Sequence, residues 1–463
     1  MANHAPPSGE ARLFPVDSVL LPLADGHLLV SRSHAIFCRI PSAEVAAVQA
    51  VLRDPSREGE LSRELAAELT RHGFGLPARP AAPASPSVQL QLTNECNLNC
   101  AYCCTDSGIA RANEVNRDQF FQVVDEARST FGPETRFGLL GGEPFLVPWA
   151  IELAEYICEL GSPLVIFSNG LRLGESDLAR CVASLVRRGA ELRISLAAVT
   201  RELCDSLSGT ARFDRAIAAV NTLCQLGIMP FVDVMLMPEA VVAAAQQLPN
   251  LRAQLPAGTP IHFGILYRGG REQGAHLFDS RRSLEAALDQ IAFDAGEVIP
   301  GDLKQPIAKR RDGCTCALGH HLNVRSDGAL FGCFKMVERI GDLATHSFAD
   351  LARGAQSRAR PAHALSYCRD CALASLCGGG CRTENLEITG DAETPACGDW
   401  RVRLSAELLA EDRPYALEWP VAHLLAEARA RAISTPSDLF GPPQQEFSSG
   451  HGRHQAYPDQ GFK

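Results

Sequence analysis

The stretch VQLQLTNECNLNCAYCC, residues 88–104, places an apolar run directly before a dense group of thiols. The apolar run predicts a strand, and the cysteines that follow it are Cys96, Cys100, Cys103 and Cys104. The first three have the spacing C-x3-C-x2-C, and thiolates at such spacing can fold around one iron–sulfur cluster on a loop. Three ligands would leave one iron open to a further ligand. The spacing alone also allows a zinc loop or an incidental group of thiols.

The composition of the whole chain limits its class and its partners. Its 463 residues are 46% hydrophobic and 21% charged, which suits a globular protein of two or three domains. The formal net charge of -10 argues against nucleic-acid and anionic-membrane partners, because both require a basic face. The first residues lack a charged segment followed by an apolar core, so we expect no signal peptide. No run approaches the roughly 18 apolar residues of a membrane span, and we expect a cytoplasmic protein.

Seventeen cysteines are too many for incidental use, and their distribution is informative. In a reducing compartment, clustered cysteines bind metal or carry out redox chemistry more often than they form disulfides. One set is the stretch quoted above, and a second set lies between Cys314 and Cys397. The others stand alone in apolar surroundings, and we expect them to be small core residues: Cys38, Cys158, Cys181, Cys204 and Cys224.

From residue 88 to about residue 268, short apolar runs alternate with amphipathic stretches such as RDQFFQVVDEARSTF and FDRAIAAVNTLCQLG. Six β-then-α units predict a parallel sheet, either an open or partial barrel or a doubly wound sheet. The predicted strands are 88–93, 136–142, 164–170, 191–198, 231–238 and 261–267.

The segments on either side differ in composition. We expect a small α+β domain near the N-terminus, in which two apolar runs around an Asp25-Gly26 turn form a hairpin and a third strand and two helices follow. A Pro- and Ala-rich linker separates it from the sheet. The expected divisions are 10–78 for this domain, 79–87 for the linker, 88–305 for the barrel, 306–400 for a Cys-rich domain, 401–433 for C-terminal helices and 434–463 for a disordered tail.

Polar or glycine-rich segments end several predicted strands. GGEPF (141–145) ends the second strand, SNG (168–170) ends the third and ISLAA (194–198) ends the fourth. Because the carboxyl ends of barrel strands carry the active site, these segments should meet at one mouth. A glycine pair lets a ligand approach the backbone closely, and Glu143 offers a carboxylate to a ligand amine.

With these motifs the sequence resembles the radical S-adenosylmethionine (SAM) family. The resemblance covers roughly residues 88–270. It rests on C-x3-C-x-aromatic-C, with Tyr102 before Cys103, and on GGEP about forty residues later. It implies a partial (β/α)6 TIM-type barrel in which SAM binds the open iron of a 4Fe–4S cluster. The cluster ligands that it implies are Cys96, Cys100 and Cys103.

The same resemblance implies an activity and a SAM site. One electron cleaves SAM to methionine and a 5′-deoxyadenosyl radical, which takes a hydrogen atom from the substrate. Two positions depart from related members: SLDG is replaced by SLAA from Ser195, and Ser208 stands where an arginine often binds the SAM carboxylate. Cys104 is expected to be a packed or idle thiol. The residues implied to contact SAM are Tyr102, Gly141, Gly142, Glu143, Ser168, Asn169 and Ser195.

The second cysteine set is ordered as well. C-x2-C pairs are common zinc ligands, but the full order resembles the SPASM extension of radical SAM enzymes. That extension carries two auxiliary iron–sulfur clusters, which we expect to be of the 4Fe–4S type. Cys314 is the uncertain ligand, and without it the first auxiliary cluster has an open iron. The implied ligands are Cys314, Cys316, Cys333 and Cys381 for the first cluster, and Cys368, Cys371, Cys377 and Cys397 for the second.

These features together predict a radical SAM/SPASM maturase that installs a crosslink or an oxidation in a ribosomal precursor peptide. Residues 10–78 could form a winged-helix-like element that binds a leader peptide as an added strand, or could be a packing extension. A flavodoxin or ferredoxin-type donor would supply electrons. Alternatives are a maturase of a protein active site, of the cofactor or formylglycine type, and a non-catalytic iron–sulfur electron carrier. Phe334, which follows Cys333, disfavours the sulfatase-maturing branch, where an aspartate stands.

Overall fold

The structure is a computed structural model that describes most of the chain between Arg12 and Pro395. Four of the expected cluster ligands lie outside the described residues, namely Cys314, Cys316, Cys377 and Cys397, as do the expected C-terminal helices and tail. The described ranges are 12–77, 86–278 and 319–395 together with Ala287 and Ile291, with gaps at 24–25, 32, 112, 334–337, 359, 370, 372–373 and 375–377.

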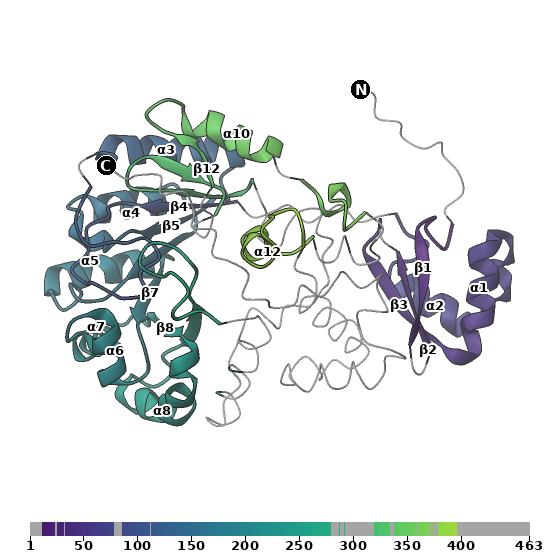
Figure 1. The fold of residues 1–463 in the computed structure, drawn as a ribbon, viewed down its shortest axis with the longest axis horizontal. Helices are drawn as coiled ribbons and strands as arrows, with labels where there is room; N and C mark the ends of the chain where they lie inside the picture. The colour runs from purple at the N-terminus through teal and green to yellow at the C-terminus, as the bar shows by residue number, and fades with distance from the viewer. Residues whose placement is uncertain are drawn as a thin grey trace.

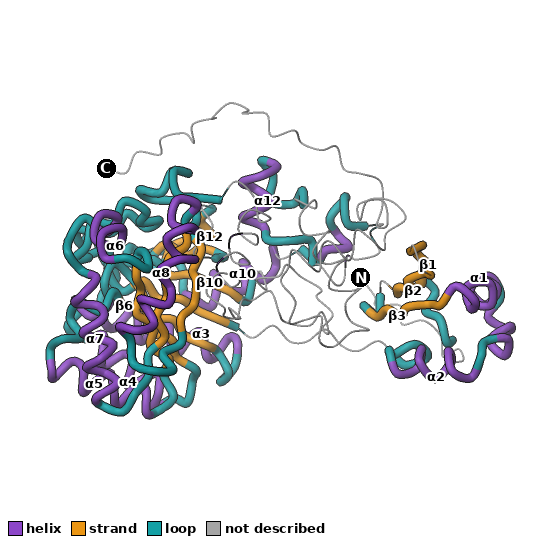
Figure 2. The backbone as a smooth tube through the Cα atoms, turned by 90° about the horizontal axis from the view of Figure 1, so that it is seen from below, coloured by secondary structure: helices purple, strands orange, loops and turns teal. Residues whose placement is uncertain are grey.

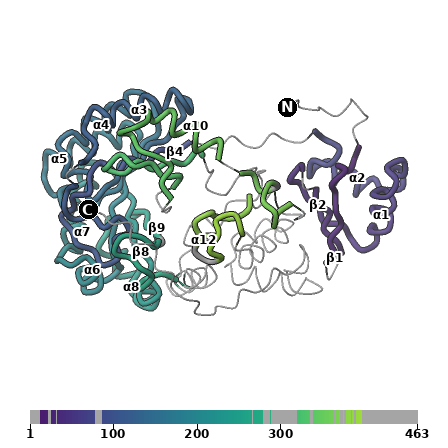
Figure 3. Tube along the Cα trace, turned by 45° about the horizontal axis from the view of Figure 1, so that its top comes forward, coloured from purple at the N-terminus to yellow at the C-terminus, as the bar shows by residue number. Residues whose placement is uncertain are grey.

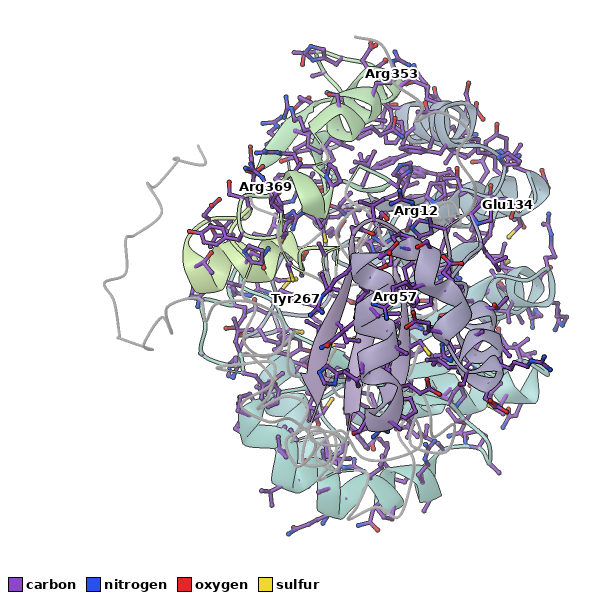
Figure 4. The ribbon with its side chains drawn as sticks, turned by 90° about the vertical axis from the view of Figure 1, so that its right-hand side faces the viewer. Arg12, Arg57, Glu134, Tyr267, Arg353 and Arg369 are labelled. Carbon is purple, nitrogen blue, oxygen red and sulfur yellow. The ribbon has the colours of Figure 1, made fainter. Side chains whose placement is uncertain are left out.

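The N-terminal domain is a three-stranded antiparallel sheet with helices packed on one face. The sheet order is β1-β2-β3, and apolar side chains such as Leu29 and Ile40 are buried against Leu65 and Leu69 of a helix. In Figure 4 this sheet and its helices face the viewer, with Arg57 among them. The structure thus has the strands and helices that the sequence predicts. Their bounds are β1 Ser18–Leu23, β2 Gly26–Ser31, β3 Ile36–Pro41, α1 Val45–Arg53 and α2 Arg63–Arg71, with 3-10 turns η1 Ser42–Glu44 and η2 Pro55–Glu60.

The central region is a parallel α/β sheet, as predicted. Strands β4 to β9 follow one another in chain order, without the reversal of a doubly wound sheet, so that alternative is wrong. Helices α3 to α8 lie along one side of the strands (Figures 1 and 2). The strands are β4 Ser87–Gln91, β5 Arg136–Leu140, β6 Leu164–Ser168, β7 Glu191–Leu196, β8 Phe231–Leu236 and β9 Ile261–Ile265. The helices are α3 Arg117–Phe131, α4 Ala150–Glu159, α5 Ser176–Arg187, α6 Arg201–Ser208, α7 Phe213–Gln225 and α8 Val241–Gln254, with turns η3 Pro144–Leu146 and η4 Pro238–Ala240.

The sheet extends further than the six predicted strands. Strand β10 (His321–Val324) pairs in parallel with β4, and β11 (Ala329–Phe331) and β12 (Arg339–Asp342) follow as antiparallel strands. These strands come from the segment expected to belong to the Cys-rich domain. Helix α10 (Phe348–Arg358) lies beside α3, as Figure 3 shows, and Phe348 meets Phe131 edge-on at 6.3 Å. Turn η6 (Ala362–Ala364) and helix α12 (Arg382–Thr389) come next.

The strands have one packed face and one more open face. Along β7, Leu192, Ile194 and Leu196 are buried in the core with the helices, whereas the residues between them are partly exposed. This alternation follows from the two-residue period of a strand. It leaves an inner face, opposite the helices, on which polar side chains can meet a ligand.

The five cysteines outside the two cysteine sets differ in their burial. Cys38 and Cys204 are buried, as expected, and Cys158 and Cys224 are partly buried against the core. The expectation for Cys181 is wrong because its side chain is exposed. Its neighbours on α5, Ala179, Val182 and Ala183, face the core, and position 181 falls on the opposite side of the helix.

Within the described residues, the helices are too short or too polar for any of them to span a bilayer.

Candidate functional site

The first cysteine set lies on a loop that continues from the carboxyl end of β4 and closes on itself. The Cys96 amide donates to the Gly108 carbonyl at 3.1 Å, and the Gly108 amide donates to the Asn94 carbonyl at 2.9 Å. The Asn94 side chain donates to the carbonyls of Asp106 and Ile109 at 3.2 and 3.1 Å. The loop is therefore held by its own backbone and presents its thiols from a fixed frame.

The three predicted ligands differ in their surroundings. Burial raises the pKa of the Cys96 thiol to about 11. Burial also raises the pKa of Cys100, while the nearby charge of Arg212 acts in the opposite direction. The Cys103 sulfur accepts a hydrogen bond from the Ser107 amide at 3.3 Å. Buried thiols of this kind ionise when a metal supplies the missing positive charge.

Burial is also the main reason that the pKa of Cys104, the fourth thiol of the stretch, is raised to about 11. The Cys104 carbonyl oxygen packs against Gly269, and a Cβ added at Gly269 would lie 2.8 Å from that oxygen. These surroundings suit the packed thiol that the sequence predicts.

The two glycines of GGEP pack against the cysteine loop. A Cβ on Gly141 would lie 2.7 Å from the Thr93 carbonyl oxygen, and a Cβ on Gly142 would lie 2.0 Å from that of Glu95. The Gly142 amide donates to Thr93 and the Glu143 amide donates to Glu95, each at 2.8 Å. The glycines therefore let the loop, and not only a ligand, approach the end of β5.

Glu143 has a fully buried side chain that joins two strand ends. Its Oε1 accepts a hydrogen bond from the Ser168 hydroxyl at 2.9 Å and one from the Phe145 amide at 3.2 Å. Its Oε2 accepts a hydrogen bond from the Asn169 amide at 2.8 Å. Burial raises the pKa of Glu143, and these hydrogen bonds and the charge of Arg212 offset part of that effect. The carboxylate thus fixes the SNG turn, a role that the sequence motif did not reveal.

Asn169 carries this network to the thiols. Its Nδ2 donates to Asn97 Oδ1 at 2.7 Å and lies 3.9 Å from Cys96 Sγ, while its Oδ1 accepts from the Leu171 amide at 3.0 Å. The GGEP turn, the SNG turn and the cysteine loop are consequently parts of one hydrogen-bonded unit.

The remaining predicted SAM-contact residues lie close to this unit. Tyr102 is buried in the core, and burial raises its pKa well above the ordinary value. Ser195 lies at the end of β7, partly exposed on the inner face, and its carbonyl accepts a hydrogen bond from Arg212.

Arg212 is a functional candidate that sequence reasoning missed. Its side chain is fully buried, Nη2 donates to the Ser195 and Asn169 carbonyls, and Nε has no hydrogen-bond partner among the described residues. The guanidinium acts electrostatically on both Cys100 and Glu143. Arg212 stands four residues after Ser208, the position where related members often have an arginine. Only burial, not sequence spacing, distinguishes it from other arginines of this segment.

Arg271 is a second missed residue and reaches the loop from beyond β9. Its Nε donates to the Cys100 carbonyl at 2.8 Å and its Nη2 to the Ser107 carbonyl at 3.0 Å. Its backbone amide donates to the Cys103 carbonyl at 2.9 Å. Gly270, with φ of +53°, permits this approach, since a Cβ there would lie 2.5 Å from the same carbonyl oxygen. Arg271 therefore clamps the loop across the open side of the sheet.

Four members of the second cysteine set fall within the described residues. Cys333, Cys368 and Cys381 are buried, and Cys371 is partly buried. Cys368 and Cys371 share one turn, in which the Cys371 amide donates to the Cys368 carbonyl at 3.1 Å. The cysteines that would complete both auxiliary clusters lie outside the described residues, so this ligand set stays a prediction.

Comparison with known proteins places these motifs in a family. The model of the radical SAM superfamily matches residues 90–240, which include the cysteine loop, GGEP and SNG. Residues 90–240 form a radical SAM domain.

Two curated relatives and one solved structure extend this result. Mycofactocin maturase MftC of Mycobacterium tuberculosis is 30% identical over 137 residues, which are 30% of this chain and 34% of that protein. This chain therefore spans only about a third of the length of MftC. PqqA peptide cyclase of Ruegeria pomeroyi is 26% identical over 336 residues, which are 68% of this chain and 87% of that protein. The structure of native anSMEcpe with bound AdoMet and Kp18Cys peptide has a TM-score of 0.52 at 15% identity, covering 74% of this chain and 99% of that one, and shows a shared fold.

The residues of the radical SAM domain fit the cofactors that the family implies, SAM and a 4Fe–4S cluster. Among the described residues, no group of three or more His, Cys, Asp or Glu side chains is arranged to hold a single metal ion. The three thiols lie on one loop, and the unpartnered Nε of Arg212 adds a buried donor beside them. This donor set fits an anionic cluster and a ligand carboxylate.

The Gly142 contact yields a first prediction. We expect Gly142→Ala to lower the thermal unfolding midpoint, because the new Cβ meets a rigid backbone oxygen of Glu95, and overpacking of this kind costs about 1–3 kcal/mol or more. Gly174→Ala is the matched control, since a Cβ there meets no atom within 4 Å. Equal midpoints for the two variants, measured by differential scanning calorimetry, would contradict the packing described above.

A second prediction concerns the clamp. Arg271→Ala removes charged hydrogen bonds to the Cys100 and Ser107 carbonyls, each worth about 1.5–3 kcal/mol. Amide hydrogen exchange over residues 96–108 should therefore become faster. Arg268→Ala is the control, because within the described residues the Arg268 side chain donates to the nearby Gln273 carbonyl and not to the cysteine loop. Unchanged exchange in the Arg271 variant would show that the loop does not depend on the clamp.

Proposed function

We propose that this protein is a radical SAM/SPASM maturase that removes a hydrogen atom from a ribosomal precursor peptide and installs a crosslink or an oxidation. The observation that carries the proposal is the single unit formed by the cysteine loop, GGEP and SNG at the carboxyl ends of β4, β5 and β6. A protein that only carried electrons through an iron–sulfur cluster would have no need for the two turns that complete a SAM site.

The residues around the loop have distinct parts in this activity. Cys96, Cys100 and Cys103 would hold the 4Fe–4S cluster at the mouth of a partial (β/α)6 barrel. When bound there, the cluster and SAM supply the 5′-deoxyadenosyl radical chemistry. Arg212 provides a fixed positive charge beside the site, and Arg271 keeps the loop in place.

The glycines and polar side chains of the site orient SAM. Glu143 is committed to Ser168 and Asn169 by hydrogen bonds, but its Oε2 accepts only one of them among the described residues and retains capacity for a ligand amine. Ser195 and the backbone at Gly141 and Gly142 lie at the same strand ends, and Tyr102 supports the loop from the core. This arrangement favours the orienting role that the family resemblance implies for these residues.

A peptide substrate is supported by the relatives. The PqqA peptide cyclase match extends over 87% of that protein, and its name gives a peptide as its substrate. The N-terminal domain has two sheet edges, at β1 and β3, to which a leader peptide could add as a strand. We therefore assign leader recognition to residues 10–78, with a winged-helix-like element as the form of this domain.

Auxiliary clusters would give the reaction an electron acceptor. The assigned ligands are Cys314, Cys316, Cys333 and Cys381 for one 4Fe–4S cluster, and Cys368, Cys371, Cys377 and Cys397 for the other. A flavodoxin or ferredoxin-type protein would reduce the SAM-site cluster in the cytoplasm. The same chemistry could act on a protein active site instead of a peptide, which is the second candidate.

The proposal is tested by anaerobic reconstitution with iron and sulfide. With dithionite and SAM, the protein should form 5′-deoxyadenosine, measured by chromatography and mass spectrometry. Cys100→Ala should abolish this product while iron of the auxiliary clusters is retained. Cys181→Ala is the matched control, because this thiol is exposed on α5 and belongs to neither cysteine set. Near-full 5′-deoxyadenosine formation by the Cys100 variant would refute the site.

Leader recognition is tested by deletion. Removal of residues 1–80 should abolish turnover of a leader-bearing precursor and leave SAM cleavage intact, because the cysteine loop and its partners all lie after residue 88. Turnover is followed as the mass change of the peptide, and a leaderless peptide serves as the control for both proteins. Undiminished turnover of the leader-bearing precursor by the truncated protein would remove the recognition role.

A further inference from the structure

A polar cluster that the proposed SAM site does not use lies on the inner face of strands β7, β8 and β9. Arg193 Nη1 lies 3.2 and 3.3 Å from the two carboxylate oxygens of Asp233. His262 Nδ1 lies 3.4 Å from Asp233 Oδ1, within ion-pair distance. The three side chains thus form a chain of charged and titratable groups across three neighbouring strands.

The position of this cluster is set by strand register. Ser195 of β7 pairs with Asp233 of β8, and Asp233 pairs with His262 of β9. Ser195, Asp233 and His262 belong to the face opposite the helices. The residues next to them on each strand, such as Ile194 and Val232, are buried in the core with the helices. Adjacent strands are about 4.8 Å apart, so His262 lies roughly 10 Å across the sheet from Ser195. His262 is therefore level, by register, with Ser195, one of the residues that the proposal assigns to SAM.

The carboxylate of Asp233 is nearly buried and is paired with Arg193. Its side chain is only 9% exposed, and Arg193 supplies the opposite charge. Arg193 is itself fixed by Glu191 and lies over the Phe231 ring at 5.2 Å. Leaving a carboxylate buried is costly unless it is paired, and Arg193 meets that need without His262. His262 is therefore an addition to the pair and not a requirement of it.

His262 directs one ring nitrogen at this pair and has a partly exposed side chain. Nδ1 is buried and makes no hydrogen bond among the described residues, while the side chain as a whole is 34% exposed. A carboxylate beside Nδ1 favours the tautomer with the proton on that nitrogen, which leaves Nε2 as a proton acceptor. Nε2 is then the ring nitrogen that a substrate can meet.

We propose that His262 is the proton acceptor of the peptide oxidation and that Asp233 is its positioning residue. This inference rests on the proposed function. Loss of two hydrogens from a peptide divides into one hydrogen atom, taken by the deoxyadenosyl radical, and one proton plus one electron. In this scheme Nε2 of His262 takes the proton from the carbon radical of the substrate. The electron would leave to a one-electron acceptor of the iron–sulfur class, such as the proposed auxiliary cluster, so that charge and atoms balance.

The test compares modified peptide with 5′-deoxyadenosine in the full-length reconstituted protein and its leader-bearing precursor. His262→Gln should still form 5′-deoxyadenosine, while the yield of modified peptide per 5′-deoxyadenosine falls by about 10²- to 10⁴-fold, the usual contribution of a general base. Asp233→Asn should lower the same ratio by a smaller factor. His346→Gln, an exposed histidine in the turn before α10, should match the unaltered protein.

Chemical rescue separates proton transfer from packing. His262→Gly should regain modified peptide when imidazole is added, which a purely structural histidine would not show. The inference would be overturned if His262→Gln formed as much modified peptide per 5′-deoxyadenosine as the unaltered protein does. Absence of 5′-deoxyadenosine from the unaltered protein would instead overturn the proposed function on which the inference rests.

Discussion

The buried carboxylate of Glu143 is the interaction on which the rest of the site depends. A desolvated negative charge costs several kcal/mol unless donors surround it, and here the donors come from the end of β6 and from the turn after β5. The hydrogen bond from the Asn169 backbone amide to Glu143 fixes the position of Asn169. The Asn169 side-chain amide then holds the cysteine loop at Asn97, beside Cys96. The motifs that we propose bind the cofactor are thus also the motifs that build the mouth of the sheet.

Much of the fold could be predicted from the sequence because its signals are local. Each predicted barrel strand, such as 136–142, overlaps an observed strand that ends two residues before the predicted end, and α3 covers the whole predicted stretch from Arg117 to Phe131. Apolar runs that alternate with amphipathic helices leave few other arrangements for a parallel sheet. The meeting of GGEP and SNG at one edge followed from the same rule.

Other features depend on contacts between distant segments and left no local signal. Arg212 and Arg271 reach the cysteine loop from more than 100 and 160 residues away, and nothing in their neighbouring residues distinguishes them from surface arginines. Strands β10 to β12 join the sheet through pairing with β4, although their Cys-rich context suggested a separate domain. Cys181 was misplaced because an apolar neighbourhood in sequence does not show which side of a helix a residue occupies.

The central claim is that three cysteines hold a cluster with one iron open to SAM. Electron paramagnetic resonance of the anaerobic, dithionite-reduced protein tests it directly, with spectra recorded before and after SAM is added. The account predicts a signal that shifts its g values on addition of SAM and that is absent from Cys100→Ala, while signals of auxiliary clusters remain unchanged. A spectrum in which neither SAM nor the Cys100 substitution alters any component would contradict it.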